Sequence, residues 1–150
     1  MDIADTVASI LAHKSVTDVW TVGATSTVFA AIQSMSDNNI GALPVVMGDQ
    51  LLGIVSERDY TRNVILKGRS SKETPVSDIM TTDVITVSPS VQVVACLQLM
   101  SEKKIRHLPV LEDGKLVGMI SIGDLVRRII SAQGALIDQL KDYVIGSYPE

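Results

Sequence analysis

Two short segments carry the residues whose types and spacing are best suited to binding a ligand. Gly53 to Asp59 reads GIVSERD and Gly118 to Asp124 reads GMISIGD, so glycine, an apolar pair, serine and aspartate recur at an interval of 65 residues. An aspartate near a helix start can accept two hydrogen bonds from a cis-diol such as ribose. The free amides and the dipole of a helix N-terminus also favour an anion. The pattern is therefore compatible with two sites for a small anionic ligand.

A capping box is the alternative interpretation of the same residues. In that arrangement Ser56 accepts a hydrogen bond from the amide three residues later, and Asp59 reaches back to the serine amide. The second copy also repeats the glycine and the apolar pair, which a helix cap does not require. Capping and ligand binding are compatible with each other, so the repetition favours a ligand site without excluding the purely structural role.

Composition excludes several classes of protein. The chain has 150 residues, 46% apolar and 20% charged, which is typical of one globular domain with a well-supplied core. A net charge of −4 and an aromatic content of only 3% argue against a nucleic-acid partner. No apolar run is long enough to span a bilayer, and the first ten residues lack the basic start of a signal peptide. We expect no membrane segment and a cytoplasmic location.

The chain offers few residues for catalysis. It contains two histidines, His13 and His107, and one cysteine, Cys96, so neither a nucleophile–base pair nor a metal cluster can be argued from spacing. None of its glycines forms a phosphate-binding loop of known spacing. Cys96 lies on the apolar side of a predicted helix and is interpreted as an inert buried thiol. We therefore expect no enzyme activity and no metal site.

An internal repeat organises most of the chain. The 65-residue offset aligns Met35–Val64 with Met100–Ile129 without a gap, and eleven of the thirty positions are identical. The same offset pairs Asp18–Val22 with Asp83–Val87. Further upstream, residues 7–11 resemble residues 76–80 only after a four-residue insertion. The chain is therefore two homologous halves.

Each half is predicted to contain a strand, a helix, two strands and a second helix. The first half should have a strand over 19–22, a helix capped by Thr25 or Ser26, and apolar strands over 43–47 and 51–55 around a Gly48-Asp49 turn. Its second helix should run from Ser56 to about Lys67 and end at Gly68. The core stripes of the first helices are Val28, Ile32 and Met35, and Val93, Leu97 and Met100.

The second half should repeat this order, which gives an α+β fold of two repeats related by a pseudo-twofold axis. Its first helix should begin at Ser88-Pro89, and its hairpin strands, 108–111 and 116–120, should flank Asp113-Gly114. The predicted units are repeat 1 over 7–68, a polar linker over 69–75, repeat 2 over 76–133, and a C-terminal helix and tail over 134–150.

The doubled pattern apolar–Thr–Val, helix, Leu–Pro–Val, turn, Gly–apolar–apolar–Ser–x–x–Asp resembles a tandem pair of cystathionine-β-synthase (CBS) domains, a Bateman module. The resemblance covers about residues 7–131, and the chain is most similar to small bacterial stand-alone CBS pairs. The likeness implies two clefts between the repeats and a disc-shaped homodimer. It also implies binding of an adenosine nucleotide, commonly AMP, ADP, ATP, NAD or S-adenosylmethionine.

The resemblance also implies which residues form the sites, because the Ser and Asp of one repeat face the strands of the other. The first cleft would contain Ser121, Asp124, Gly41, Ala42, Leu43, Pro44, Val19 and Trp20. The second would contain Ser56, Asp59, Arg106, His107, Leu108, Pro109, Val84 and Ile85. The Leu-Pro pairs have a simple alternative role in core packing.

Arg58 is the strongest phosphate-binding candidate on local grounds, because its planar guanidinium stands beside Asp59 at a helix start. Gly123 replaces it in the second copy, so the two clefts should differ. Arg106 and His107 form another candidate pair for phosphate. In each case an exposed surface charge is the alternative interpretation.

These observations predict a sensor that binds an adenosine nucleotide, with AMP the first choice, and that acts in trans on an unknown regulated protein. The intact Ser and Asp in both copies argue against complete loss of binding. The alternative is a scaffold or protein-interaction module whose clefts bind no ligand.

Overall fold

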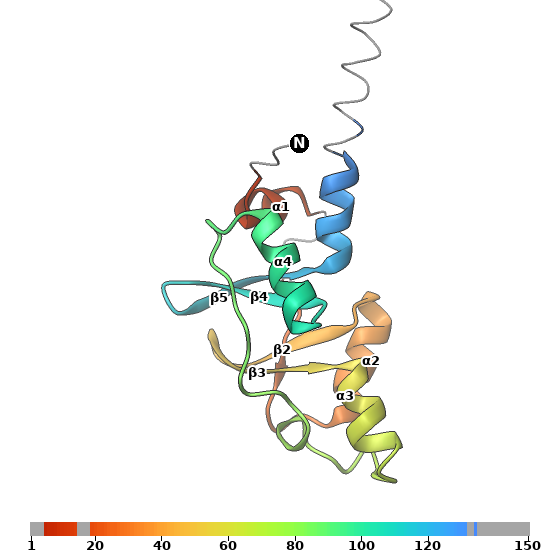
Figure 1. The fold of residues 1–150 in the computed structure, drawn as a ribbon. Helices are drawn as coiled ribbons and strands as arrows, with labels where there is room; N and C mark the ends of the chain where they lie inside the picture. The colour runs from red at the N-terminus through yellow and green to blue at the C-terminus, as the bar shows by residue number, and fades with distance from the viewer. Residues whose placement is uncertain (1–4, 15–18, 132–133, 135–150) are drawn as a thin grey trace, which may run out of the picture.

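The computed structural model describes residues 5–14, 19–131 and 134. Figure 1 shows two α/β units stacked on each other, with α4, β4 and β5 in the upper unit and α2, α3, β2 and β3 in the lower. The α+β class and the two repeats are therefore confirmed. The predicted C-terminal helix and tail over 134–150 lie outside the described residues, apart from Gly134.

The first half forms a three-stranded sheet in the order β1-β2-β3. β1 pairs with β2 in parallel, and β2 pairs with β3 as an antiparallel hairpin. Its elements are β1 (Val22–Gly23), α2 (Val28–Asn38), β2 (Ala42–Met47), β3 (Gln50–Ser56), α3 (Glu57–Tyr60) and the π-helical stretch η1 (Thr61–Ile65).

The second half repeats the hairpin with two strands only. A single parallel bridge from Val87 to Val110 occupies the place that β1 has in the first half. Along the chain, the second half contains the short 3-10 helix η2 (Val76–Asp78), α4 (Val93–Lys103), β4 (His107–Glu112), β5 (Lys115–Ser121) and a helix over 122–131. The helix α1 (Val7–His13) precedes β1 in the sequence. Both predicted hairpin turns are confirmed, with positive φ at Gly48 (65°) and at Asp113 and Gly114 (52° and 78°).

The predicted starts of the first helix in each half were wrong. Thr27, not Thr25 or Ser26, caps α2, and its hydroxyl accepts the amide of Ala30 at 3.1 Å. The carbonyl of Ser26 instead accepts a hydrogen bond from the amide of Val76 at 2.8 Å, which holds Ser26 outside α2.

In the second half α4 begins after Gln92, well beyond the predicted Ser88-Pro89. The carbonyls of Pro89 and Val91 accept the first amides of α1, each at 2.9 Å. These bonds come from a segment far away in the sequence, so local capping rules could not place the helix start.

Two other predicted boundaries also moved. The first strand is Val22–Gly23 and not 19–22. The helix after Ser56 begins where predicted, but it changes at Thr61 from α to π geometry and ends at Ile65, short of the predicted Lys67, with a turn at Gly68, whose φ is +67°.

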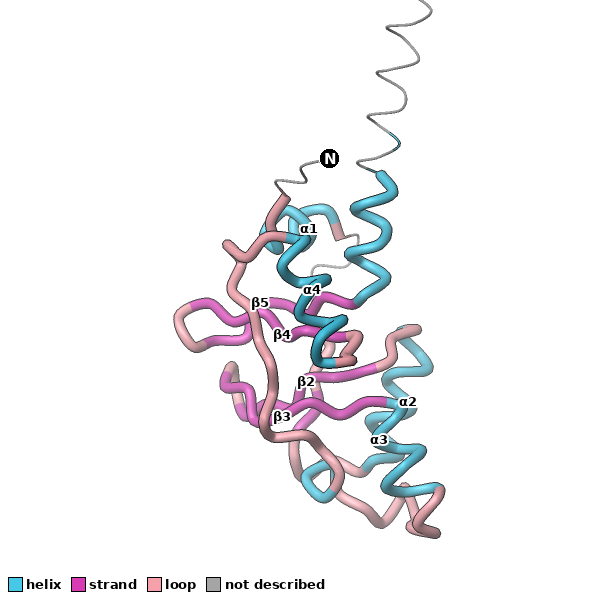
Figure 2. Tube along the Cα trace, viewed as in Figure 1, coloured by secondary structure: helices cyan, strands magenta, loops and turns pink. Residues whose placement is uncertain are grey.

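Each half completes its core with the entry segment of the other half. Val7 and Ile10 of α1 are buried in the second-half core, while Val76 and Ile79, at η2, are buried in the first-half core. Figure 2 shows the long loop that links the first unit to α4. The sequence units 7–68 and 76–133 are therefore not the two spatial units, because their first segments are exchanged.

Candidate functional site

A cleft of about 720 Å³ lies between the two halves. Three separate stretches of the chain bring predicted residues to its walls: the segment before β1, the start of β2, and the end of β5 with the helix that follows. The predicted residues that line it are Val19, Trp20, Gly41, Ala42, Pro44, Ser121 and Asp124. The structure thus brings together most of the residues assigned to the first cleft.

Leu43 and Leu108 do not line this cleft. Both side chains are fully buried, each in the core of its own half. Successive side chains of a strand point to opposite faces, so Ala42 and Pro44 can face the cleft while Leu43 faces the core. The simple packing role accounts for both leucines.

Asp124 is the most heavily bonded side chain of the cleft, and only 9% of it is exposed. One carboxylate oxygen accepts the Ser121 amide at 2.8 Å and the Lys14 ammonium at 3.1 Å. The other oxygen accepts Nη2 of Arg127 at 2.7 Å. Burial alone would raise the pKa of this carboxyl, but these three donors outweigh burial and hold its pKa below the ordinary value. Asp124 is therefore an anion at neutral pH.

The Ser–Asp pairs form capping boxes in both halves. Ser121 Oγ accepts the Asp124 amide at 3.2 Å, as Ser56 Oγ accepts the Asp59 amide at 3.2 Å. Asp59 in turn accepts the Ser56 amide at 2.9 Å. The capping interpretation is confirmed for both copies, and at Asp124 it coexists with a position on the cleft wall.

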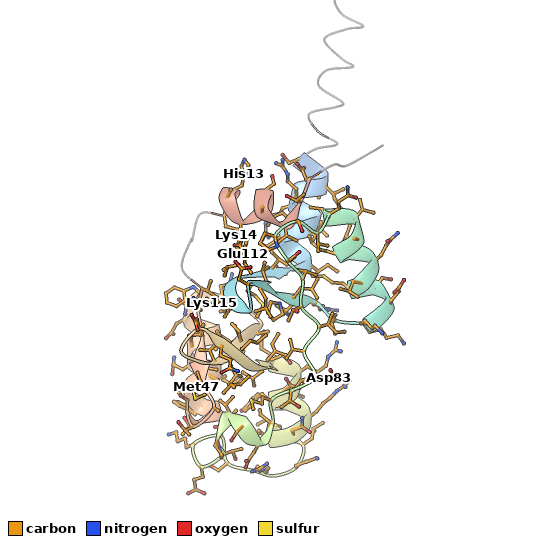
Figure 3. All side chains as sticks on the ribbon, turned by 90° about the vertical axis from the view of Figure 1, so that its left-hand side faces the viewer. His13, Lys14, Met47, Asp83, Glu112 and Lys115 are labelled. Carbon is orange, nitrogen blue, oxygen red and sulfur yellow. The ribbon has the colours of Figure 1, made fainter. Side chains whose placement is uncertain are left out.

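Lys14, the C-cap residue of α1, was missed by the sequence analysis. Its ammonium donates to the carbonyl of Met119 at 2.9 Å as well as to Asp124. Figure 3 places it at the end of α1, beside His13. Only the exchange of α1 into the second half brings Lys14 here, and no local signal in the sequence indicates that exchange.

His107 was assigned to the second cleft, but its side chain lines the first. It lies against Gly41, where an added Cβ would be 3.4 Å from Cε1 of His107 and 3.0 Å from the Glu57 carboxylate. A side chain at position 41 would therefore crowd this wall. Burial lowers the pKa of His107; Arg106 and Lys14 lower it further and Asp124 opposes them, so neutral pH favours the uncharged ring.

The other residues assigned to the second cleft do not line the cleft at Asp124. Arg58 and Arg106 are exposed, and neither lines the cleft described above. Pro109 is buried and its carbonyl accepts the Val87 amide at 3.1 Å, while Ile85 packs against the second-half core. A second hollow, of about 500 Å³, runs along α4 and contains none of these residues.

Within the described residues, His, Cys, Asp and Glu nowhere gather in a group of three that could hold a metal ion. Across that same part of the chain, the helices are too short or too polar to cross a bilayer. Cys96 is fully buried, as predicted, and burial raises the pKa of its thiol. This thiol is therefore protonated and inaccessible.

The fold and cleft define a class of protein with two α/β repeats that share a ligand-sized cavity. The model of the CBS domain matches residues 7–65 and 76–131, so the chain belongs to the CBS-domain family. Modules of this family are regulatory and are known to bind adenosine ligands.

Individual relatives agree with this assignment. The chain is 46% identical over 127 residues to the mitochondrial CBS domain-containing protein CBSX3 of Arabidopsis thaliana, a match that covers 81% of this chain and 62% of the plant protein. It is 34% identical to the CBS domain-containing protein YhcV of Bacillus subtilis, over 79% of this chain and 84% of that one. A CBS-domain structure from Burkholderia ambifaria MC40-6 superposes with a TM-score of 0.81 at 52% identity and covers 85% of this chain and 96% of its own.

Proposed function

We propose that the cleft binds an adenosine nucleotide, AMP above all, and that the protein is a regulatory module that acts on a separate partner. The observation that carries this proposal is the position of Asp124. Its anionic carboxylate stands at the start of a helix and on the wall of a cleft. A carboxylate in that position can accept both hydroxyls of a ribose.

The remaining walls suit the other parts of a nucleotide. Ala42 and Pro44 offer apolar surface and backbone edges to a base, and Trp20 is 43% exposed. Lys14 and Arg127 supply positive charge for phosphate. The volume, about 720 Å³, lies within the usual range of small-molecule sites.

A panel of nucleotides in a thermal-shift assay tests the proposal. We expect AMP, ADP, ATP, NAD or S-adenosylmethionine to raise Tm, and guanosine and pyrimidine nucleotides to have little effect. Ligand at 100 times its Kd adds about 2.7 kcal/mol to the free energy of unfolding. A chain of this length gains roughly 2–4 °C per kcal/mol, so the expected rise is about 5–11 °C.

The protein must first be unfolded, stripped of bound ligand and refolded, because ligand retained from expression would hide the response. No shift with any adenosine compound at millimolar concentration would contradict nucleotide binding. That result would favour the ligand-free scaffold instead.

We also propose that the protein forms a homodimer through the second helices of its two halves. These helices expose large apolar side chains that a monomer leaves in water: Ile65, Leu66, Ile122, Val126 and Ile130. Burial of one such face against its copy would give a closed twofold interface. Light scattering should return twice the monomer mass, and a monomer mass at every concentration would contradict the proposal.

A further inference from the structure

We propose that Lys14 and Arg127 select ligands that carry a phosphate. The ribose diol of the ligand displaces these cations from Asp124, and the displaced cations then bind the phosphate of the ligand. The cleft would thereby prefer a nucleoside phosphate to the free nucleoside. This inference rests on the proposed function and names the groups that set its selectivity.

The lone pairs of Asp124 cannot serve all of these donors at once. An ionised carboxylate offers about four acceptor positions. Three are taken, by the Ser121 amide, the Lys14 ammonium and the Arg127 guanidinium. A ribose diol brings two further donors, so five donors would compete for four positions. At least one cation must therefore leave the carboxylate when the diol binds.

The Ser121 amide is part of the helix cap and stays in place, so a displaced donor is one of the two cations. Arg127 is 73% exposed and lies one helical turn from Asp124, which leaves it free to turn. Lys14 is 32% exposed and is also held by the Met119 carbonyl at 2.9 Å, so it remains beside the cleft. A neutral nucleoside would move a cation away from the Asp124 carboxylate and offer it no other anion. A nucleotide offers its phosphate as the new anionic partner.

Arg128, the other arginine on the cleft wall, is engaged elsewhere. Its guanidinium binds Asp5 with two hydrogen bonds, at 2.7 and 3.1 Å. In the first half, Asp59 accepts bonds from its own Ser56, and among the described residues it forms no ion pair with a lysine or arginine. The proposed selectivity therefore belongs to the cleft at Asp124.

Calorimetric titration of AMP and of adenosine into the stripped full-length protein tests the inference. The Lys14→Met and Arg127→Gln variants should each raise the Kd for AMP by about 10- to 100-fold. The Kd for adenosine should stay unchanged or fall, because the diol then displaces one cation fewer. Lys14→Arg, which keeps the charge, should retain the preference for AMP.

Arg62→Gln is the matched control, because Arg62 is an exposed arginine of the other half that does not line the cleft. It should leave both Kd values unchanged. If Lys14→Met and Arg127→Gln weakened the binding of AMP and of adenosine equally, the two residues would have a merely structural role. That result would overturn this inference but not the proposed function. If the unaltered protein bound neither compound, the proposed function would fail and the inference with it. Arg127 is mostly exposed, so its variant should fold even if Lys14→Met does not.

Discussion

Replacement of Asp124 with Ala is expected to weaken the binding of adenosine by roughly 10- to 150-fold, because charged hydrogen bonds to the ribose, about 1.5–3 kcal/mol, are lost. The binding of AMP should be weakened less, because removal of the carboxylate also frees Lys14 and Arg127 to bind the phosphate. Titration calorimetry of both compounds gives the two Kd values. Loss of the helix cap should in addition lower the free energy of unfolding by about 0.5–2 kcal/mol.

Asp59→Ala separates the two roles of the aspartate. Asp59 makes the same capping box in the first half but does not line the cleft at Asp124. It should therefore cost similar stability and leave binding in that cleft intact. If Asp124→Ala lowered stability as much as Asp59→Ala and left affinity for both compounds unchanged, Asp124 would be a helix cap only.

Leu108→Ala should lower the free energy of unfolding by about 2–5 kcal/mol, because it removes a fully buried side chain and leaves a cavity. The corresponding fall in Tm is roughly 4–20 °C. Thermal and urea unfolding would measure both quantities. Under conditions where the variant is folded, its affinity for AMP should stay close to that of the unaltered protein.

Val94→Ala provides a comparison on the exposed side of α4, where 39% of the side chain is in water. Its effect on stability should stay within about 0.5 kcal/mol. If the folded Leu108→Ala variant lost much of its affinity for AMP while its stability changed little, Leu108 would be a ligand-binding residue. That result would contradict its assignment to the core.

Features that depend on local pattern could be read from the sequence. The apolar stripes of the first helices are confirmed, because Val28, Met35, Val93 and Met100 are buried where the helical spacing placed them. The hairpin turns also depend on a few adjacent residues. The Ser–Asp capping boxes follow from a three-residue spacing in the same way, so the start of each second helix was correct.

Features that depend on contacts between the halves could not be read in this way. The starts of α2 and α4 are fixed by backbone hydrogen bonds from residues more than forty positions away. The same holds for Lys14, whose bond to Asp124 spans 110 residues. His107 faces the first cleft because of how its strand lies against Gly41, which the repeat alignment cannot show.

The exchanged entry segments also determine how the two halves depend on each other. Cutting the chain within the linker over 69–75 would give two fragments that each hold part of the other's interior, α1 in one and η2 in the other. Such fragments would stay associated as a non-covalent complex, because each fragment alone would expose an apolar face to water. The smallest stretch that carries the complete interior of the first half therefore runs from β1 through Ile79, across the apparent boundary between the repeats. The repeat visible in the sequence is a unit of duplication, whereas the unit of folding is offset from it by one segment.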